Sequence, residues 1–172
     1  MNNIELKVDS LEQQANNNIL ICSGTYVTNL LQSNNQENLK ESLSLKIKNT
    51  FRSLTIDDDD IAKLNVFGKN KKNLKITCSS VNFKFALLKE IRNLKPKDIY
   101  FSEFLTPHRN NLYFQLRKLK REYPDRVSAA YTRNGNIYCK IASDDNQRIR
   151  LIKDISCIIE LERLVTLSTA SA

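Results

Sequence analysis

The sequence predicts an α+β protein with a short coiled-coil-like N-terminal helix, a ferredoxin-like β-α-β-β-α-β domain and a small α+β C-terminal domain carrying a basic helix and a β-hairpin. Strand-like and helix-like hydrophobic periods follow one another along residues 19–101 in the ferredoxin-like order. Asn134-Gly135 lies between two alternating segments and is a strong hairpin signal, because both central positions of the turn need positive φ. With 41% hydrophobic residues and only three glycines and three prolines, the chain can build packed cores and has no glycine-rich phosphate loop.

Residues 1–17 form the predicted N-terminal segment, whose residues 1–15 are helical. Ile4, Val8, Leu11 and Ala15 follow one another at spacings of four, three and four, which is the a/d rhythm of a heptad. Two heptads are too few for a stable isolated coiled coil. The helix is therefore either the end of a longer coil, which implies a dimer or trimer, or an amphipathic cap on the domain that follows.

Residues 18–97 form the predicted ferredoxin-like domain, closed by a strand at 99–101. The pattern predicts strands at 19–22, 61–67 and 74–78, a polar loop at 24–36, and helices at 37–54 and from a Ser79 or Ser80 cap to 94. The second of these helices is expected to bury Val81, Phe85, Leu88 and Ile91.

This order of elements is that of RNA-recognition-motif domains, which stack bases on aromatic residues of their two central strands. Here those strands, 19–22 and 74–78, carry no aromatic residue. The domain is therefore expected to contribute only phosphate contacts, from Lys69, Lys71 and Lys72 in the turn after Gly68 and from Lys75. The alternative is a solvated basic turn.

Residues 98–172 form the predicted C-terminal domain, which opens with a helix that Thr106 caps and Pro107 starts. Its apolar stripe is Leu112, Leu116, Leu119 and Tyr123. The hairpin follows, then a strand at 148–152, a helix at 154–164 and a small-residue tail at 167–172.

The Asn134-Gly135 turn fixes the hairpin register and sorts its side chains between two faces. In this register Arg133 faces Asn136 and Tyr131 faces Tyr138. One face should be core, and it carries Ala130, Thr132, Ile137, Cys139 and Ile141. The other face carries Tyr131, Arg133, Asn136, Tyr138 and Lys140. Two aromatic rings flanked by cations are typical of a platform on which a base stacks while a phosphate is neutralised.

Positive charge is concentrated around the predicted platform. Residues 107–140 hold eight cations and two acids, a net charge of +6 out of +8 for the chain. The cations are Arg109, Arg117, Lys118, Lys120, Arg121, Arg126, Arg133 and Lys140. Such clustering is the electrostatic pattern of a polyanion binder. The alternative is an ordinary cross-strand tyrosine pair on a surface whose cations only maintain solubility.

The sequence offers little for catalysis, and we expect neither an enzyme nor a cofactor or metal centre. Its single histidine, His108, lies at a helix start, and its four cysteines include no C-x-x-C pair, which predicts buried free thiols. The acids 57–60 could hold Mg²⁺, although a solvated loop is the favoured interpretation. No apolar run is long enough for an integral membrane segment, and no secretory signal opens the chain, so we expect a soluble intracellular protein.

Two strings carry a resemblance to a known family. They are Ile99-Tyr-Phe-Ser-Glu-Phe-Leu-Thr-Pro107 and Tyr131-Thr-Arg-Asn-Gly-Asn-Ile-Tyr138, joined by a Leu-x-x-x-Leu-x-x-Leu-Lys-Arg helix. Together with the heptad segment and the strand that ends at Phe67-Gly68, they resemble the baculovirus few-polyhedra (FP) protein family. That family is itself similar to the first-open-reading-frame proteins of long interspersed retroelements. The resemblance covers nearly the whole chain and is strongest at residues 99–140.

The resemblance implies an oligomeric coil, an RNA-recognition-motif-like domain and a basic C-terminal domain that binds single-stranded RNA or DNA without catalysis. It implies contacts at Arg109, Arg117, Lys120, Arg121, Tyr131, Arg133, Tyr138 and Lys140. Tyr131 stands where many relatives are expected to have Trp. The implied location is the cytoplasm or nucleus of an infected insect cell, with virion association and viral protein partners as further implications. Viral members affect occlusion-body formation and the traffic of virion envelope proteins.

The leading hypothesis from the sequence is a single-stranded nucleic-acid-binding protein with little sequence specificity. The rival is a viral structural or trafficking factor whose basic surface contacts acidic protein or anionic membrane.

Overall fold

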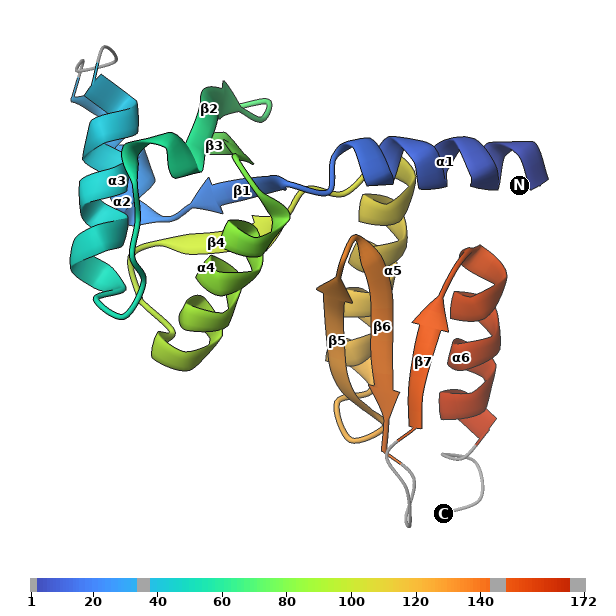
Figure 1. Cartoon of the computed structure of the whole chain (residues 1–172). Coiled ribbons are helices and arrows are strands. Elements are labelled where there is room, and N and C mark those ends of the chain that lie inside the picture. The colour runs from blue at the N-terminus through green and yellow to red at the C-terminus, as the bar shows by residue number, and fades with distance from the viewer. Residues whose placement is uncertain (1–2, 34–37, 143–147, 168–172) are drawn as a thin grey trace. The chain divides into compact units, whose positions relative to one another are not determined.

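The computed structural model describes residues 3–33, 38–142 and 148–167, and over these the chain is an α+β protein with two antiparallel sheets (Figure 1). It divides into two compact units, Asn16–Phe104 and the combination of Met1–Ala15 with Leu105–Ala172. The divisions fall after residues 15 and 104, whereas the sequence suggested 17 and 97. They differ because the strand after residue 99 pairs within the first sheet, and because the N-terminal helix packs in the C-terminal unit.

The four-stranded sheet of the unit Asn16–Phe104 has the order β2-β3-β1-β4. Its strands are β1 (Ile19–Ser23), β2 (Ile61–Phe67), β3 (Asn73–Cys78) and β4 (Tyr100–Glu103). Every neighbouring pair is antiparallel. These strands confirm the predicted ones to within two residues, because alternation and the Gly68 turn define them locally.

Three helices cover one face of this sheet: α2 (Thr25–Gln32), α3 (Leu39–Thr50) and α4 (Val81–Leu94) (Figure 1). The predicted loop over 24–36 was wrong, since α2 occupies most of it; residues 34–37 lie outside the described residues. Val27 is buried, and Leu30 and Leu31 pack against the core at the helical spacings of three and four. The helix predicted over residues 37–54 is shorter than expected, since α3 ends at Thr50.

The helix α4 begins as predicted, because the Ser80 hydroxyl accepts a hydrogen bond from Phe83 N–H at 3.1 Å. Its buried side matches the prediction in part: Leu88 is buried and Ile91 packs against the core, but Phe83 is in the core and Phe85 is 38% exposed. Lys84 is buried on this side of the helix as well, with 1% of its surface exposed. Its Nζ lies 2.9 Å from Glu103 Oε1 and donates to the Asn17 carbonyl at 2.7 Å. A buried charge is tolerated when it is paired and hydrogen-bonded in this way.

The C-terminal unit has a three-stranded sheet of order β5-β6-β7. Its elements are α1 (Asn3–Ala15), α5 (Pro107–Glu122), β5 (Val127–Arg133), β6 (Asn136–Ile141), β7 (Arg148–Ile152) and α6 (Ile155–Leu167). The predicted Leu112, Leu116 and Leu119 are buried on α5, and Ile158 and Leu161 of α6 join them over the same face of the sheet. The Thr106 cap and the Pro107 start are confirmed. Of the predicted tail, residues 168–172 lie outside the described residues.

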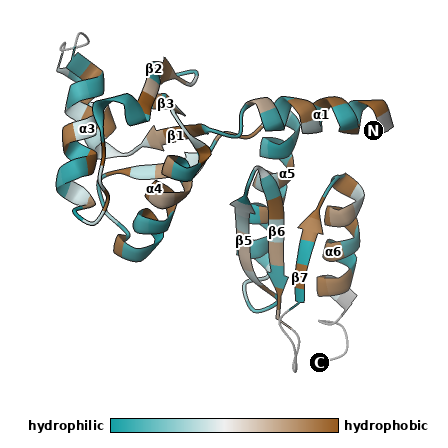
Figure 2. Ribbon diagram, viewed as in Figure 1, coloured by the Kyte–Doolittle hydropathy of each residue, from teal (hydrophilic) through white to brown (hydrophobic). Residues whose placement is uncertain are grey.

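The helix α1 contacts its unit through its polar side. Asp9 and Gln13 are buried, and Gln13 Oε1 accepts the Thr106 N–H at 3.0 Å. The predicted apolar stripe lies on the other side, where Val8 is 49% and Leu11 65% exposed. Figure 2 shows the resulting alternation of hydrophobic and hydrophilic residues along α1. Within its own unit the helix therefore buries its polar side, and the predicted stripe makes no part of that contact.

Candidate nucleic-acid interface

The hairpin β5–β6 has the predicted register. Tyr131 pairs with Tyr138 and Arg133 with Asn136, and the turn residues Asn134 and Gly135 have φ values of 54° and 72°. Positive φ at both positions gives the turn the twist that two antiparallel strands require. The predicted core face is confirmed as well, since Ile137 and Cys139 are buried and Ala130 and Ile141 pack against the same core.

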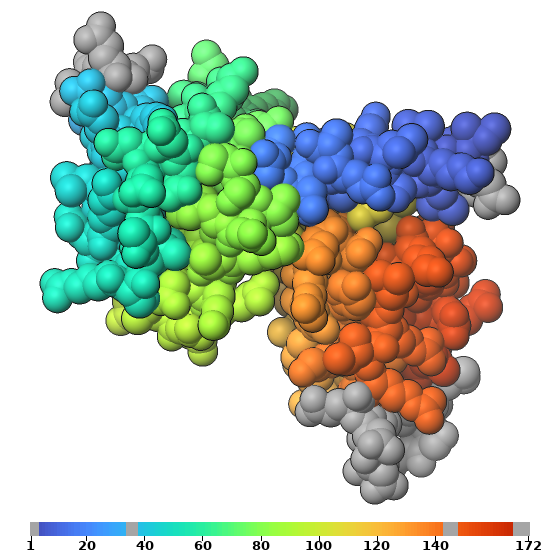
Figure 3. All heavy atoms as spheres, viewed as in Figure 1, coloured from blue at the N-terminus to red at the C-terminus, as the bar shows by residue number. Residues whose placement is uncertain are grey.

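Tyr131 and Tyr138 lie on the face that the helices leave open. Their ring centroids are 5.6 Å apart and their planes are 18° from parallel, so the rings stack on each other. Each ring therefore covers part of one face of the other, and the pair behaves as one aromatic block. A base can stack on the outer faces of this block, while its edges point to solvent. In Figure 3 the orange atoms of the hairpin lie in front, and α5 is almost hidden behind them.

The strand β7 extends this open face with two apolar side chains that the sequence analysis did not select. Leu151 pairs with Tyr138 and Ile149 with Lys140. Leu151 is 39% and Ile149 57% exposed. Alternation alone would assign both to the core, because arginines occupy the other face of the strand. The register reverses that assignment, since Arg150 Nη1 pairs with Glu160 Oε1 of α6 at 3.1 Å.

The open face of the three-stranded sheet carries cations and no acid among its described residues. We use this name for Ala129, Tyr131, Arg133, Asn136, Tyr138, Lys140, Ile149 and Leu151. Arg133 is exposed beside the turn, and Lys140 is half-buried between Ala129 and Ile149. The face thus joins an aromatic block, an apolar margin and positive charge, which are the chemical features that a base and its phosphate need.

The predicted cations of α5 lie on the opposite side of the sheet, because α5 packs on the covered face. Arg117, Lys118 and Arg121 are exposed there and Lys120 is half-buried. Lys118 Nζ lies 3.7 Å from Glu122 Oε1. The sequence therefore predicted one basic platform, and the structure divides its members between two sides of the unit.

Aromatic residues that the sequence analysis did not select accompany these α5 cations. Phe114 is 63% exposed, and the Arg117 guanidinium lies 5.9 Å from the Tyr113 ring centroid. These residues and Arg121 line a shallow hollow of about 510 Å³ on the outer side of the helix. The spacing of 113, 114, 117 and 121 on one helical face was the available signal.

Arg109, a predicted contact residue, is engaged inside the unit. Its Nε donates to Asp9 Oδ2 at 2.7 Å, and its Nη1 donates to the Gly135 carbonyl at 2.9 Å and to Asn136 Oδ1 at 3.1 Å. The second oxygen of Asp9 accepts a hydrogen bond from the Thr106 hydroxyl. Arg109 thus ties α1 to the hairpin turn. It lines a pocket of about 230 Å³ together with Asp9, Asn136, Leu151 and Lys153.

The remaining predicted contacts, Lys69, Lys71 and Lys72, belong to the other unit. All three are exposed in the turn between β2 and β3, where Gly68 and Lys71 have φ values of 91° and 49°. They lie in the unit Asn16–Phe104 and so are not part of the open face described above.

The described residues hold no group of three or more His, Cys, Asp and Glu side chains arranged to bind a metal. Asp57 and Asp60 are instead occupied with a local turn, since Asp60 Oδ2 accepts the Asp57 N–H at 2.9 Å. His108 Nε2 is buried and has no hydrogen-bond partner among the described residues. None of the described helices combines the length and the apolar character that crossing a membrane requires.

Comparison with known proteins adds no assignment to this geometry. The chain matches no protein-family model and no curated protein, so the case for its function depends on the residues and contacts above.

Proposed function

We propose that the chain is a non-enzymatic protein that binds single-stranded RNA or DNA with little sequence specificity. One observation carries the proposal: the stacked pair Tyr131–Tyr138 lies on an open sheet face together with Arg133 and Lys140, and the described residues of that face include no acid. Stacking is tolerant of base identity, and phosphate contacts carry no sequence information. The proposed site therefore distinguishes single-stranded from double-stranded nucleic acid better than it distinguishes one base sequence from another.

The proposed binding geometry uses both sides of the C-terminal unit. Bases stack on the outer faces of the tyrosine block, and Arg133 and Lys140 neutralise the adjoining phosphates. The exposed Arg117 and Arg121 add to the positive field of the unit from α5 and raise the rate of encounter with a polyanion. Arg109 contributes indirectly in this proposal, by holding α1 against the hairpin turn.

We further propose that the unit Asn16–Phe104 is an RNA-recognition-motif-like domain of the few-polyhedra type. The support is the strand order β2-β3-β1-β4 with every neighbouring pair antiparallel, which is the ferredoxin-like arrangement with one added helix, α2, in the first crossover. The family strings at 99–107 and 131–138 support the same proposal from the sequence.

The test is fluorescence anisotropy with single-stranded RNA, single-stranded DNA and duplex DNA over a range of salt. We expect preference for single strands, with log K falling by about 0.7 per decade of salt for each phosphate contact. Replacing Tyr131 and Tyr138 together by Ala should weaken binding by about 1–3 kcal/mol per stacked base.

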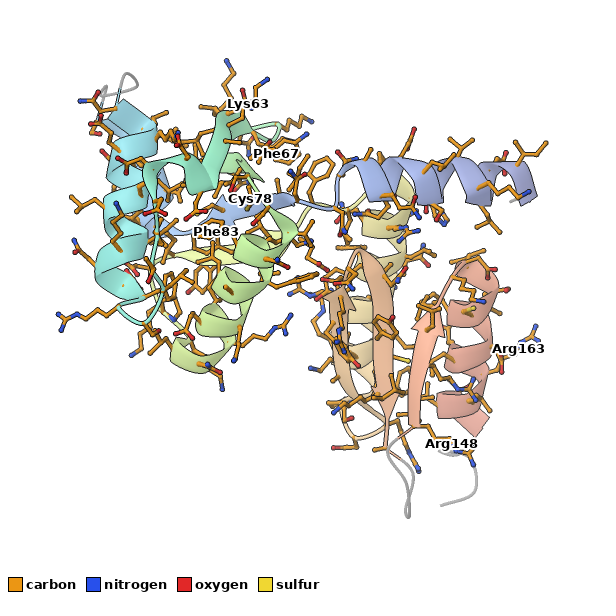
Figure 4. All side chains as sticks on the ribbon, in the orientation of Figure 1. Lys63, Phe67, Cys78, Phe83, Arg148 and Arg163 are labelled. Atoms are coloured by element: carbon orange, nitrogen blue, oxygen red, sulfur yellow. The ribbon has the colours of Figure 1, made fainter. Side chains whose placement is uncertain are left out.

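Two control variants separate stacking and charge from general damage to the fold. Replacing both tyrosines by Phe keeps the rings and should keep the affinity. Arg133→Gln should weaken binding, whereas Arg163→Gln should not, because Arg163 lies on α6 away from the open face (Figure 4). Equal affinity for all three nucleic acids, abolished by salt, would show that only general charge attraction is present.

A second candidate function is a structural or trafficking role through protein contacts. The observation that favours it is the exposed apolar margin of Ile149 and Leu151 beside Tyr138. Ile149→Ser would then abolish capture of a viral protein partner while leaving single-strand affinity unchanged. Loss of single-strand affinity with Ile149→Ser would assign the margin to the nucleic-acid site instead.

A further inference from the structure

The four-stranded sheet also has one face that its helices leave open. Leu20, Cys22, Leu74, Ile76 and Cys78 point into the core beneath α2, α3 and α4. Alternation places the intervening residues on the other side. From the strand register this second open face carries Lys63, Asn65, Phe67, Asn73, Lys75, Thr77, Ile19, Ile21, Ser23, Tyr100 and Ser102, with Phe104 just beyond β4. The set includes two lysines, three aromatic residues and no acid.

Three of these side chains gather into one cluster. The Phe67 and Phe104 ring centroids are 5.7 Å apart with planes at 72°, and Lys75 Nζ lies 4.2 Å from the Phe104 centroid. Phe67 is at the end of the edge strand β2, Lys75 is on the central strand β3, and Phe104 follows β4 at the other edge. A ring from the chain beyond β4 therefore reaches over the central strands and supplies the aromatic surface that those strands lack.

Charge at this face favours an anionic ligand. Lys63 and Phe67 both project from β2 (Figure 4), and Lys75 lies between β1 and β2. The adjoining turn adds Lys69, Lys71 and Lys72, which are exposed. Among the described residues of the face no carboxylate opposes these ammonium groups. A polyanion whose monomers also have flat aromatic parts satisfies both the charge and the rings.

We infer that the open face of the four-stranded sheet is a second contact surface for single-stranded nucleic acid, with Phe67 as a base-stacking residue and Lys63 and Lys75 as phosphate contacts. The inference rests on the proposed function, because the ligand is the same. It assigns to the unit Asn16–Phe104 a base-stacking role that its two central strands do not predict, because Phe67 ends the edge strand β2 and Phe104 follows β4.

The test compares Phe67→Ala with Phe85→Ala in the full chain, by anisotropy with a single-stranded oligonucleotide. The two residues form a matched pair. Phe67 is 37% and Phe85 38% exposed, but Phe85 is on α4, which covers the opposite side of the sheet. Phe67→Ala should weaken binding about fivefold to tenfold, and Phe85→Ala should leave it unchanged.

Crosslinking gives a direct second readout that does not depend on a variant's fold. Irradiation of the wild-type complex with an oligonucleotide containing 5-iodouracil should attach nucleotide to the tryptic peptide of residues 64–69, which contains Phe67, and not to that of residues 85–89, which contains Phe85.

The outcomes separate this inference from the proposed function. One outcome would overturn only the second surface. In it, Tyr131→Ala weakens single-strand binding, Phe67→Ala leaves binding unchanged, and crosslinking labels no peptide of residues 64–69. A wild-type chain that binds no single strand would overturn the proposed function and this inference together. Weakening by Phe67→Ala with labelling of its peptide would support the second surface.

Discussion

The four cysteines of this chain differ in the solvent exposure of their thiols. Cys22, Cys78 and Cys139 are buried, while Cys157 is partly exposed on α6. Burial raises the pKa of the Cys78 thiol to about 12 and also raises the pKa of Cys22 and Cys139, because a thiolate is poorly solvated in an apolar core. Reaction with a thiol reagent requires the thiolate, so these three thiols should react slowly.

The first prediction concerns these thiols. At pH 8 a disulfide reagent should modify Cys157 quickly, and should modify Cys22, Cys78 and Cys139 only after denaturant is added. The measurement is the time course of absorbance on reagent cleavage, with peptide mass spectrometry to assign each site. Cys157→Ser is the control, and it should remove the fast phase. A fast phase that persists in this variant would contradict the assignment of buried thiols.

Single residues also show where a role depends on tertiary context. Tyr131 and Arg109 both belong to the predicted contact set. Tyr131 stacks on Tyr138 at the surface, as the local turn required. Arg109 is held by Asp9, a residue 100 positions away, and no local pattern contains that information. Of these two predicted contact residues, Tyr131 thus lies where its local pattern predicted, whereas Arg109 has a structural contact that only the tertiary structure reveals.

At the scale of the element, α1 is the clearest departure from its sequence pattern. A heptad stripe predicts an apolar contact, yet the contact that α1 makes within its unit is polar. Asp9 and Arg109 form an ion pair in which the side chains are 10% and 15% exposed. Because two hydrogen-bonded charges are largely removed from water there, the removal of one partner leaves the other uncompensated.

The second prediction tests this polar contact. Asp9→Ala should lower the free energy of unfolding by about 2–3 kcal/mol, since it removes the carboxylate that is paired and hydrogen-bonded with Arg109. Lys118→Ala is the matched control, because its pair with Glu122 is solvent-exposed and should contribute less than about 0.5 kcal/mol. Both values come from urea unfolding followed by circular dichroism. Similar losses for the two variants would show that the α1 contact contributes little.

At the scale of the whole molecule, the exposed stripe of α1 favours self-association. Val8 and Leu11 are at heptad positions and are 49% and 65% exposed. Two helices that pair through such a stripe remove both from water, and the polar side of each helix remains on its own unit. We propose that the chain forms a homo-oligomer through this stripe. Two or three copies would then present several nucleic-acid surfaces to one strand, which raises avidity.

The third prediction concerns this assembly. Analytical ultracentrifugation at micromolar concentration should show a dimer or trimer for the wild-type chain and a monomer for Leu11→Glu. Leu45→Glu is the matched control, because Leu45 is 59% exposed on α3, outside the stripe, and its replacement should leave the assembly intact. Sedimentation of the wild-type chain as a monomer would contradict the proposed self-association through α1.

Most strands, the Thr106 cap, a serine cap at residue 79 or 80 and the register of the hairpin could be predicted from the amino-acid sequence alone. These features depend on neighbours within a few residues, where turn chemistry and hydrophobic period act directly. Contacts between distant segments determine four other features: α1 packs through its polar side, Leu151 joins the open face, Lys84 pairs with Glu103, and Phe104 reaches Phe67. The hydrophobic period of a helix or strand shows that it has an apolar and a polar face, whereas the elements packed around it determine which face is buried.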